Sequence, residues 1–213
     1  MVAPQEHEYS VMGGTNRVTV GRLLTLVASV VSGGLVFLIL QAVDLAQKLG
    51  LNVNAPPTVL SLVGASAVFG LLYALLSKWA WKWPLIGTAL KVPDVSGTWD
   101  CVGKTLDGTT GATRYDWQGE VTIVQSWDKL RIRLTTKNSG SSSISAALAH
   151  DSVDGFVLLY HYRNDPKPGA VGLASHTGCS VMTIAKDRKS AEGEYFNGRG
   201  RMSFGTMTWT KRN

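Results

Sequence analysis

Two long apolar runs, separated by a short polar turn, dominate the first part of the chain. Residues 23–40 form an 18-residue run without a charged side chain, and residues 57–76 form a second run of 20. An α-helix rises 1.5 Å per residue, so each run spans roughly the ~30 Å hydrocarbon core of a bilayer. Neither run shows the polar face of a helix in a soluble bundle. The pattern predicts a membrane hairpin at 19–83, with helices at about 23–43 and 57–77.

The flanking residues favour spanning helices over a cleaved signal peptide. The 22 residues before the first run include Glu6 and Glu8, and the run is long for the apolar part of a signal peptide. Lys and Arg flank the outer ends of the hairpin, at Arg17, Arg22, Lys78, Lys82 and Lys91, and the turn carries only Lys48. Basic residues favour the cytoplasmic side, so both termini are expected there.

The sequence KWAWKW follows the second run. Trp79, Trp81 and Trp83 are predicted to anchor the chain in the headgroup layer, where indole rings concentrate and lysines meet anionic lipid. Residues 84–91 are then expected to be an interfacial linker, and residues 1–18 a mobile cytoplasmic arm.

Small residues recur four positions apart within the apolar runs. Ser29 with Gly33, and Ser66 with Gly70, would let membrane helices approach closely. This packing could lie within one hairpin or between protomers, and the sequence leaves both open. The runs carry no ionisable residue, which argues against a proton relay.

From residue 92 onward the pattern changes to short blocks of alternating polar and apolar residues, with no helical period. Turn signals such as KNSGSS and FNGRGR separate the blocks. Eight strands are predicted, at about 98–105, 116–126, 129–136, 141–150, 155–162, 176–185, 189–196 and 204–211. The expected fold is a membrane α hairpin followed by an all-β, up-and-down barrel at 92–213, with a β-sandwich as the alternative. Trp99 is expected in the barrel floor.

Charge separates the same two parts. Residues 1–91 carry nine charged side chains and residues 92–213 carry 27, yet the net charge of +6 divides equally between them. This even division argues against a DNA-binding protein, and it is compatible with a small anionic ligand. Cys101 and Cys179 form neither a disulfide framework nor a metal site, and we expect both to be reduced.

A search for catalytic motifs favours no enzyme class. The sequence lacks a G-x-S-x-G elbow and an HExxH motif. His176 and Cys179 are three residues apart, which places them on opposite faces of a strand. A structural role for His176 is therefore expected, and no catalytic residue, metal or cofactor is predicted.

The segment GEYFNGRGR, residues 193–201, suggests a ligand site instead. Tyr195 and Asn197 share one face of a predicted strand, and Arg199 and Arg201 alternate with glycines. Arginines bind phosphate oxygens bidentately, so this segment is a candidate phosphate clamp. Tyr160 and Tyr162 could add rings on which bases stack. A hairpin turn with solvated arginines is the alternative interpretation.

Two segments behind the hairpin resemble a known family. VPDVSGTWDCVGKT (92–105) and GEYFNGRGRMSFGTMTWTKR (193–212) are similar to segments of the two-transmembrane, β-strand-rich effectors of bacterial cyclic-oligonucleotide anti-phage signalling, CBASS. The resemblance implies that the barrel binds a cyclic dinucleotide made after infection. Binding would drive the hairpins to associate into homo-oligomers, disrupt the bacterial inner membrane and kill the infected cell.

Other functions remain compatible with the sequence. The barrel could carry a hydrophobic ligand as lipocalins do, in which case its interior should be apolar without arginines at the mouth. A membrane-anchored scaffold that binds another protein is a further alternative, and a hydrolase using His176 is a third.

Overall fold

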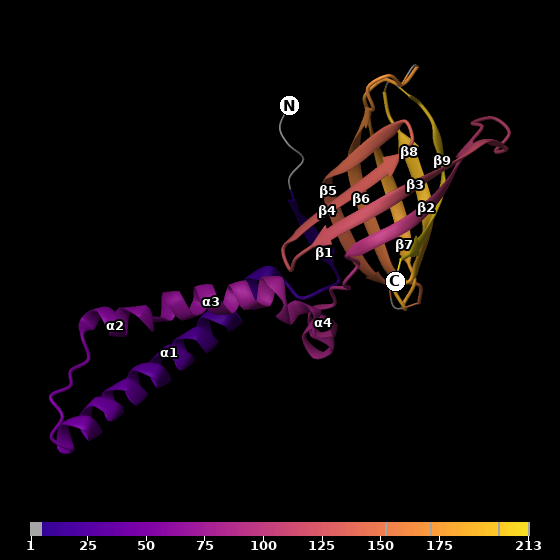
Figure 1. Ribbon diagram of the computed structural model, residues 1–213. Coiled ribbons are helices and arrows are strands. Elements are labelled where there is room, and N and C mark those ends of the chain that lie inside the picture. The colour runs from indigo at the N-terminus through magenta and orange to yellow at the C-terminus, as the bar shows by residue number, and fades with distance from the viewer. Residues whose placement is uncertain (1–5, 152, 171, 200, 213) are drawn as a thin grey trace. The chain divides into compact units, whose positions relative to one another are not determined.

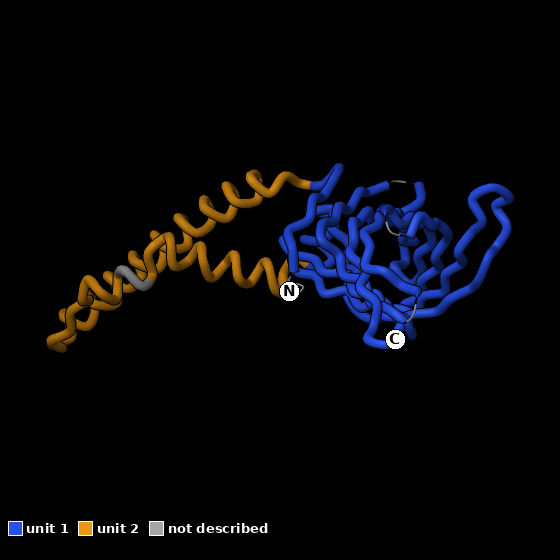
Figure 2. The backbone as a smooth tube through the Cα atoms, turned by 90° about the horizontal axis from the view of Figure 1, so that it is seen from above, with its two compact units in different colours: residues 1–14, 82–213 blue, residues 15–81 orange. Residues whose placement is uncertain are grey.

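The computed structural model describes residues 6–151, 153–170, 172–199 and 201–212. They form two compact units, coloured separately in Figure 2. One unit is helical and comprises Thr15–Trp81. The other combines the segment that ends at Gly14 with the chain from Lys82 onward.

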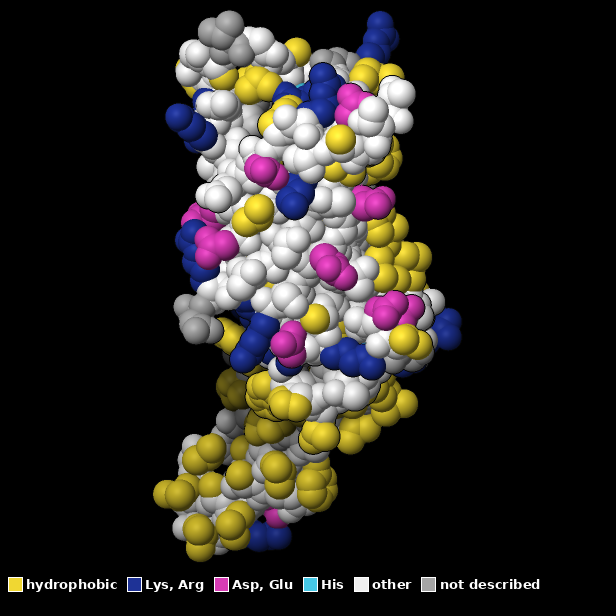
Figure 3. Space-filling view, turned by 90° about the vertical axis from the view of Figure 1, so that its right-hand side faces the viewer, with side chains coloured by type: hydrophobic (Ala, Val, Ile, Leu, Met, Phe, Trp, Pro, Cys, Tyr) yellow, Lys and Arg dark blue, Asp and Glu magenta, His cyan; other side chains and the backbone are white. Residues whose placement is uncertain are grey.

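The helical unit contains the two predicted membrane spans. Helix α1 covers Arg17–Lys48 and begins at Asn16, whose side chain accepts a hydrogen bond from the Val18 amide at 2.8 Å. The second span contains α2 (Pro57–Leu62) and α3 (Ala65–Lys78). Mean hydropathy reaches 2.5 in the first span and 2.2 in the second, and hydrophobic side chains cover the outer surface of the helices in Figure 3.

The second span is interrupted, whereas the sequence pattern predicts one continuous helix. Helix α2 ends at Leu62 and α3 begins at Ala65, with Gly64 as the N-cap of α3. Ser32 of α1 donates a hydrogen bond to the Val63 carbonyl at 2.6 Å, so a polar group at the interruption is satisfied inside the hairpin.

Packing within the hairpin uses one of the small-residue pairs spaced four positions apart and leaves two others exposed. Ala28 and Ser32 of α1 are buried, as are Val68 and Leu76 of α3. The predicted packing residues, by contrast, are all exposed in a single hairpin: Ser29, Gly33, Ser66 and Gly70. Of the two arrangements left open by the sequence, packing within one hairpin is therefore not observed for these four.

The junction after α3 is helical. A 3₁₀ turn covers Ala80–Lys82, and a short helix, α4, covers Pro84–Leu90 with proline at its first turn. Trp79 and Trp83 are 60% and 62% exposed, as an interfacial anchor requires, but Trp81 is fully buried. The prediction of a headgroup anchor is therefore wrong for Trp81.

The second unit is a closed β-barrel (Figure 1). Its ring order is β1-β4-β3-β2-β9-β8-β7-β6-β5, with a further direct pairing of β4 and β5. The eight predicted strands are confirmed to within three or four residues at each end, as β2 (Gly97–Leu106), β3 (Thr113–Gln125), β4 (Lys129–Thr136), β5 (Ser139–Asp151), β6 (Gly155–Pro166), β7 (His176–Ile184), β8 (Ser190–Asn197) and β9 (Phe204–Lys211).

A ninth strand comes from the N-terminal segment. Strand β1 (His7–Met12) pairs antiparallel with the start of β4 and parallel with Ala146–Ala149 of β5. The predicted mobile arm is therefore wrong for His7–Met12, and the first five residues lie outside the described part. This pairing explains why the segment is an ordered strand. Where β4 and β5 are no longer paired with each other, their backbone N–H and C=O groups need partners, and β1 supplies them.

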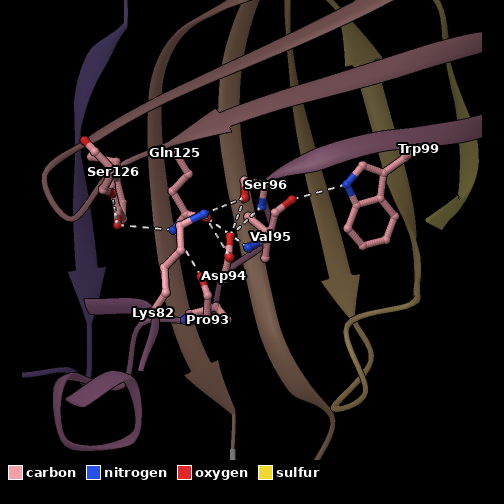
Figure 4. A network of polar contacts seen from close by, with 9 residues as sticks. Lys82, Pro93, Asp94, Val95, Ser96, Trp99, Gln125 and Ser126 are labelled. Atoms are coloured by element: carbon pink, nitrogen blue, oxygen red, sulfur yellow. Dashed lines mark hydrogen bonds and ion pairs between the residues drawn. The ribbon is translucent and has the colours of Figure 1, made fainter. Parts of the chain in front are cut away.

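The core lies inside the barrel. Inward side chains alternate with outward ones, and Trp99, Val121, Leu158, Met182 and Trp209 have no exposed surface. The Trp99 ring lies 6.3 Å from that of Trp209, and its Nε1 donates to the Val95 carbonyl at 3.2 Å (Figure 4). The predicted floor position of Trp99 is confirmed.

Candidate functional site

A cavity of about 940 Å³ opens in the barrel at the end opposite Trp99. Residues of all eight strands from β2 to β9 line it, together with Lys137, Asn138, Gly172, Leu173, Arg201 and Ser203 from the connecting turns. Its volume lies at the upper end of the range for small-molecule sites, about 300–1,000 Å³. The barrel is therefore packed at one end and hollow at the other.

Three tyrosines form an aromatic wall of this cavity. Tyr160 and Tyr162 project from β6 and Tyr195 from β8, and all three line the cavity although they are at least 93% buried. Positions two apart on a strand face the same side, which explains why Tyr160 and Tyr162 lie with ring centroids 5.8 Å apart. The three tyrosines suggested by the sequence thus lie in the wall of one cavity, and their contact with a ligand stays a prediction.

Hydrogen bonds fix the orientation of two of these tyrosines. The Tyr195 hydroxyl lies 2.7 Å from Thr105 Oγ1 and accepts from Trp117 Nε1 at 3.2 Å, with the Trp117 ring edge-on at 5.7 Å. The Tyr162 hydroxyl donates to Asn197 Oδ1 at 2.9 Å. Burial raises the pKa of Tyr160, Tyr162 and Tyr195, so all three hydroxyls stay protonated at neutral pH.

Asn197 lies at the mouth side of this wall. It follows Tyr195 by two residues on β8, is buried, and donates from Nδ2 to Ser203 Oγ at 2.9 Å. Its amide is thereby held between Tyr162 and Ser203. Asn197 lines the cavity on the same face of β8 as Tyr195.

Of the two arginines in the predicted clamp, only Arg201 lines the cavity. It is partly buried, and one guanidinium nitrogen donates to the Tyr115 hydroxyl at 2.8 Å. Although burial alone would raise it, hydrogen bonds from Thr105 and Arg201 lower the pKa of Tyr115. Arg199 is exposed and does not line the cavity. The paired clamp of Arg199 and Arg201 is therefore not observed.

Two other basic side chains line the cavity and were missed in the sequence. Arg114 lies at the start of β3, and Lys137 lies in the turn between β4 and β5. An up-and-down barrel brings alternate turns to the same end, so the turns after β2, β4 and β8 meet there. That rule gives a signal that could have identified both residues, together with the acidic Asp116 beside them.

His176 also lines the cavity, at the first position of β7. Its Nδ1 lies 2.9 Å from the Ala174 carbonyl, which can only accept, so the proton lies on Nδ1 in the neutral ring. Its Nε2 is then the acceptor for Asn164 Nδ2 at 3.4 Å. Both ring nitrogens have protein partners, and Cys179 lies on the opposite face of β7, as predicted. This geometry supports a structural histidine.

The described part of the chain contains no cluster of three or more metal-ligating side chains. Cys101 and Cys179 are both unpaired thiols, as expected, and burial raises the pKa of Cys101 to about 12. The arrangement offers aromatic faces, neutral hydroxyl donors and cationic groups, and these are groups that bind a ligand.

Comparisons with known proteins agree in both parts of the chain. Residues 90–211 match the family model described as "Cap15, cyclic dinucleotide receptor domain", and residues 18–82 match "Cap15, TM helices". The chain is also similar to "CD-NTase-associated protein 15" of Yersinia aleksiciae, with 43% identity over 209 residues. This match covers 97% of the chain and 98% of the relative.

Proposed function

Because the chain belongs to the Cap15 family of membrane-bound CBASS effectors, we propose that it is a receptor gated by a cyclic dinucleotide. The ligand binds in the barrel cavity. Binding then drives the membrane hairpins to assemble and permeabilise the bacterial inner membrane, and the infected cell dies before phage matures.

The observation that carries this proposal is the composition of the cavity wall. A cyclic dinucleotide presents two bases and two anionic phosphates. Bases stack on aromatic rings such as those of Tyr160, Tyr162 and Tyr195, and phosphate oxygens accept hydrogen bonds from arginine and from neutral hydroxyls. Arg201, Arg114 and Lys137 supply positive charge at the mouth.

The same wall disfavours a lipocalin-like carrier. A site for a hydrophobic ligand is expected to be apolar, because polar groups that lose water without a partner oppose binding. Here polar residues such as Thr105, Asn197 and Ser141 share the cavity wall with the basic groups. His176, the residue on which the hydrolase alternative rests, already has partners on both nitrogens.

The membrane part of the proposal has two elements. Both termini lie in the cytoplasm, because basic residues flank the outer ends of the hairpin. The exposed small residues Ser29, Gly33, Ser66 and Gly70 form the surfaces through which protomers associate, since small side chains let helix backbones approach closely. We propose no catalytic step.

Calorimetric titration of the detergent-solubilised, full-length protein tests the ligand. Cyclic di-AMP, cyclic di-GMP, cyclic GMP-AMP and a pyrimidine-containing cyclic dinucleotide serve as the panel, with oleate as the hydrophobic probe. Submicromolar binding of at least one panel member, with no comparable binding of oleate, is expected. Binding of oleate alone would identify a carrier, and no binding of either kind would favour a scaffold.

A further inference from the structure

The membrane hairpin is attached to the barrel at two points, and one of them is a strand within the barrel wall. After α3 the chain enters the barrel through Lys82–Ser96, as an appended domain would. Before α1, however, the chain is β1, and only residues 13–16 separate β1 from α1. The strand β1 and the helix α1 are therefore joined directly by four residues.

Strand β1 fills a split between two strands that are paired only in part. Strands β4 and β5 pair directly through Arg133–Thr135 and Gly140–Ser142, and then separate. Farther from the turn that joins β4 to β5, His7 and Glu8 pair with Leu130 and Lys129 of β4, and the rest of β1 pairs with Ala146–Ala149 of β5. The wall is thus closed by a segment that belongs to the membrane connection.

A side-chain clasp marks the point of separation. Ser143 of β5 is 6% exposed, and its Oγ accepts the Ile132 amide of β4 at 2.9 Å. His7 Nδ1 lies 2.9 Å from the Glu8 carbonyl and so carries the proton of the neutral ring, in which Nε2 accepts the Ser143 hydroxyl at 2.7 Å. The register of β5 shifts immediately afterwards, between Ser143 and Ser145.

The opposite end of the same two strands lines the cavity. Leu134 and Thr136 of β4, Ser139 and Ser141 of β5, and the turn between them belong to its wall. Ser141 precedes Ser143 by two residues, so it lies on the same face of β5 one pleat nearer the mouth. The cavity wall and the hydrogen bonds of Ser143 therefore lie in consecutive sections of the β4–β5 hairpin.

We propose that the β4–β5 hairpin is the element that transmits ligand binding to the membrane, and that His7 is its positioning residue. This inference rests on the proposed function. A ligand held by the cavity end of the β4–β5 hairpin favours one of two separations between β4 and β5. That separation determines the position of β1 and of the chain entering α1. The ligand drives this change through its different affinity for the two separations.

The test uses the full-length protein in liposomes filled with a self-quenching dye. The sequence Gly-Ser-Gly-Ser is inserted between Gly14 and Thr15, which leaves β1 in the barrel but slackens its connection to α1. The matched control carries the same insertion between Leu51 and Asn52, in the turn between α1 and α2. The ligand is whichever cyclic dinucleotide the wild-type protein binds in the titration described above.

The insertion after Gly14 is expected to leave the Kd within about threefold of wild type and to raise the ligand concentration for half-maximal leakage at least about tenfold. The control insertion should leak like wild type. Wild-type leakage by the insertion after Gly14 would overturn the inference, as would loss of ligand binding by this variant. The proposed function fails separately, if the wild-type protein binds no cyclic dinucleotide.

A point substitution tests the clasp without changing chain length. His7→Ala should shift the leakage curve in the same direction with an unchanged Kd, and His7→Gln, whose amide oxygen can accept the Ser143 hydroxyl, should restore it. A purely structural role would lower thermal stability without separating leakage from binding. Equal leakage by His7→Ala and wild type at equal ligand occupancy would remove His7 from the mechanism.

Discussion

Gln125 donates a hydrogen bond from Nε2 to the Tyr9 hydroxyl at 3.3 Å, which joins the end of β3 to the strand that precedes the first membrane helix. The same amide donates to the Pro93 carbonyl at 3.0 Å and accepts from the Val95 amide at 2.9 Å. Pro93 and Val95 belong to the segment that follows the second membrane span, and Figure 4 shows their contacts with Gln125. One buried side chain therefore binds both connections between the barrel and the hairpin.

Gln125→Leu should destabilise the barrel. The substitution leaves the Val95 amide and the Pro93 carbonyl without their side-chain partner, and an unsatisfied buried polar group costs about 1–3 kcal/mol. We expect a loss of this size in urea unfolding followed by tryptophan fluorescence. Gln118→Leu, at an exposed position of the same strand, is the control. Equal stability of the two variants would show that the network is not important for the fold.

Arg201 and Arg199 provide a matched pair for the ligand site, because they are two residues apart and only Arg201 lines the cavity. Arg201→Ala should weaken cyclic dinucleotide binding by about 10- to 100-fold, which corresponds to a charged hydrogen bond worth about 1.5–3 kcal/mol. Arg199→Ala should change the Kd by less than about threefold. Titration calorimetry measures both, and the reverse order of effects would place the phosphates outside the cavity.

Asp94 makes the stability of the barrel floor depend on pH. Burial alone would raise its pKa, but hydrogen bonds from Ser96 and Lys82 and the charge of Lys82, 3.1 Å away, lower it below the usual value. A carboxyl whose pKa is lower in the folded state stabilises that state above the unfolded pKa, about 3.9, and this contribution is lost as the pH falls through the folded value.

Asp94→Asn should therefore be less stable than wild type at pH 7, by about 1 kcal/mol because the pair is partly exposed. At a pH below the folded-state pKa of Asp94 the two proteins should unfold at similar urea concentrations, since the wild-type carboxyl is then protonated. A difference that persisted at low pH would assign the effect to packing rather than to charge.

Gly33 and Gly34 test the proposed association of hairpins. Both are exposed in α1, and a Cβ at either position meets nothing within 4 Å, so neither substitution disturbs a single hairpin. Gly33→Leu obstructs the stripe that contains Ser29, and it should reduce ligand-induced dye leakage at least about tenfold without changing the Kd. Gly34 is the next residue of α1 and lies outside that stripe, so the Gly34→Leu variant should release more dye than the Gly33→Leu variant. Equal leakage by Gly33→Leu and wild type would remove the stripe from the interface.

The strands that follow the membrane hairpin were predictable because each carries its own periodic signal. Tyr195 and Asn197 are two positions apart, so the alternation of a strand places both on one face of β8, and the structure shows that this face is the inner one. The order of consecutive hairpins also follows from short turns such as that at Lys137. A barrel closed by antiparallel neighbours therefore needs little information beyond local pattern.

The features that were not predictable depend on contacts distant in sequence. Strand β1 is only His7–Met12, and its identity as a strand comes from partners more than 100 residues away. Trp81 occurs in the same motif as Trp79 and Trp83, and only the fold distinguishes the buried ring from the exposed ones. Arg199 and Arg201 likewise differ in position although each directly follows a glycine.

The most direct test of the account measures dye release from liposomes containing the full-length protein as a function of ligand occupancy. Release by the wild-type protein should rise with occupancy of the cavity by a cyclic dinucleotide, and Arg201→Ala should require about tenfold more ligand for the same release. Tight binding of the ligand without any release of dye, or equal release with and without ligand, would contradict it.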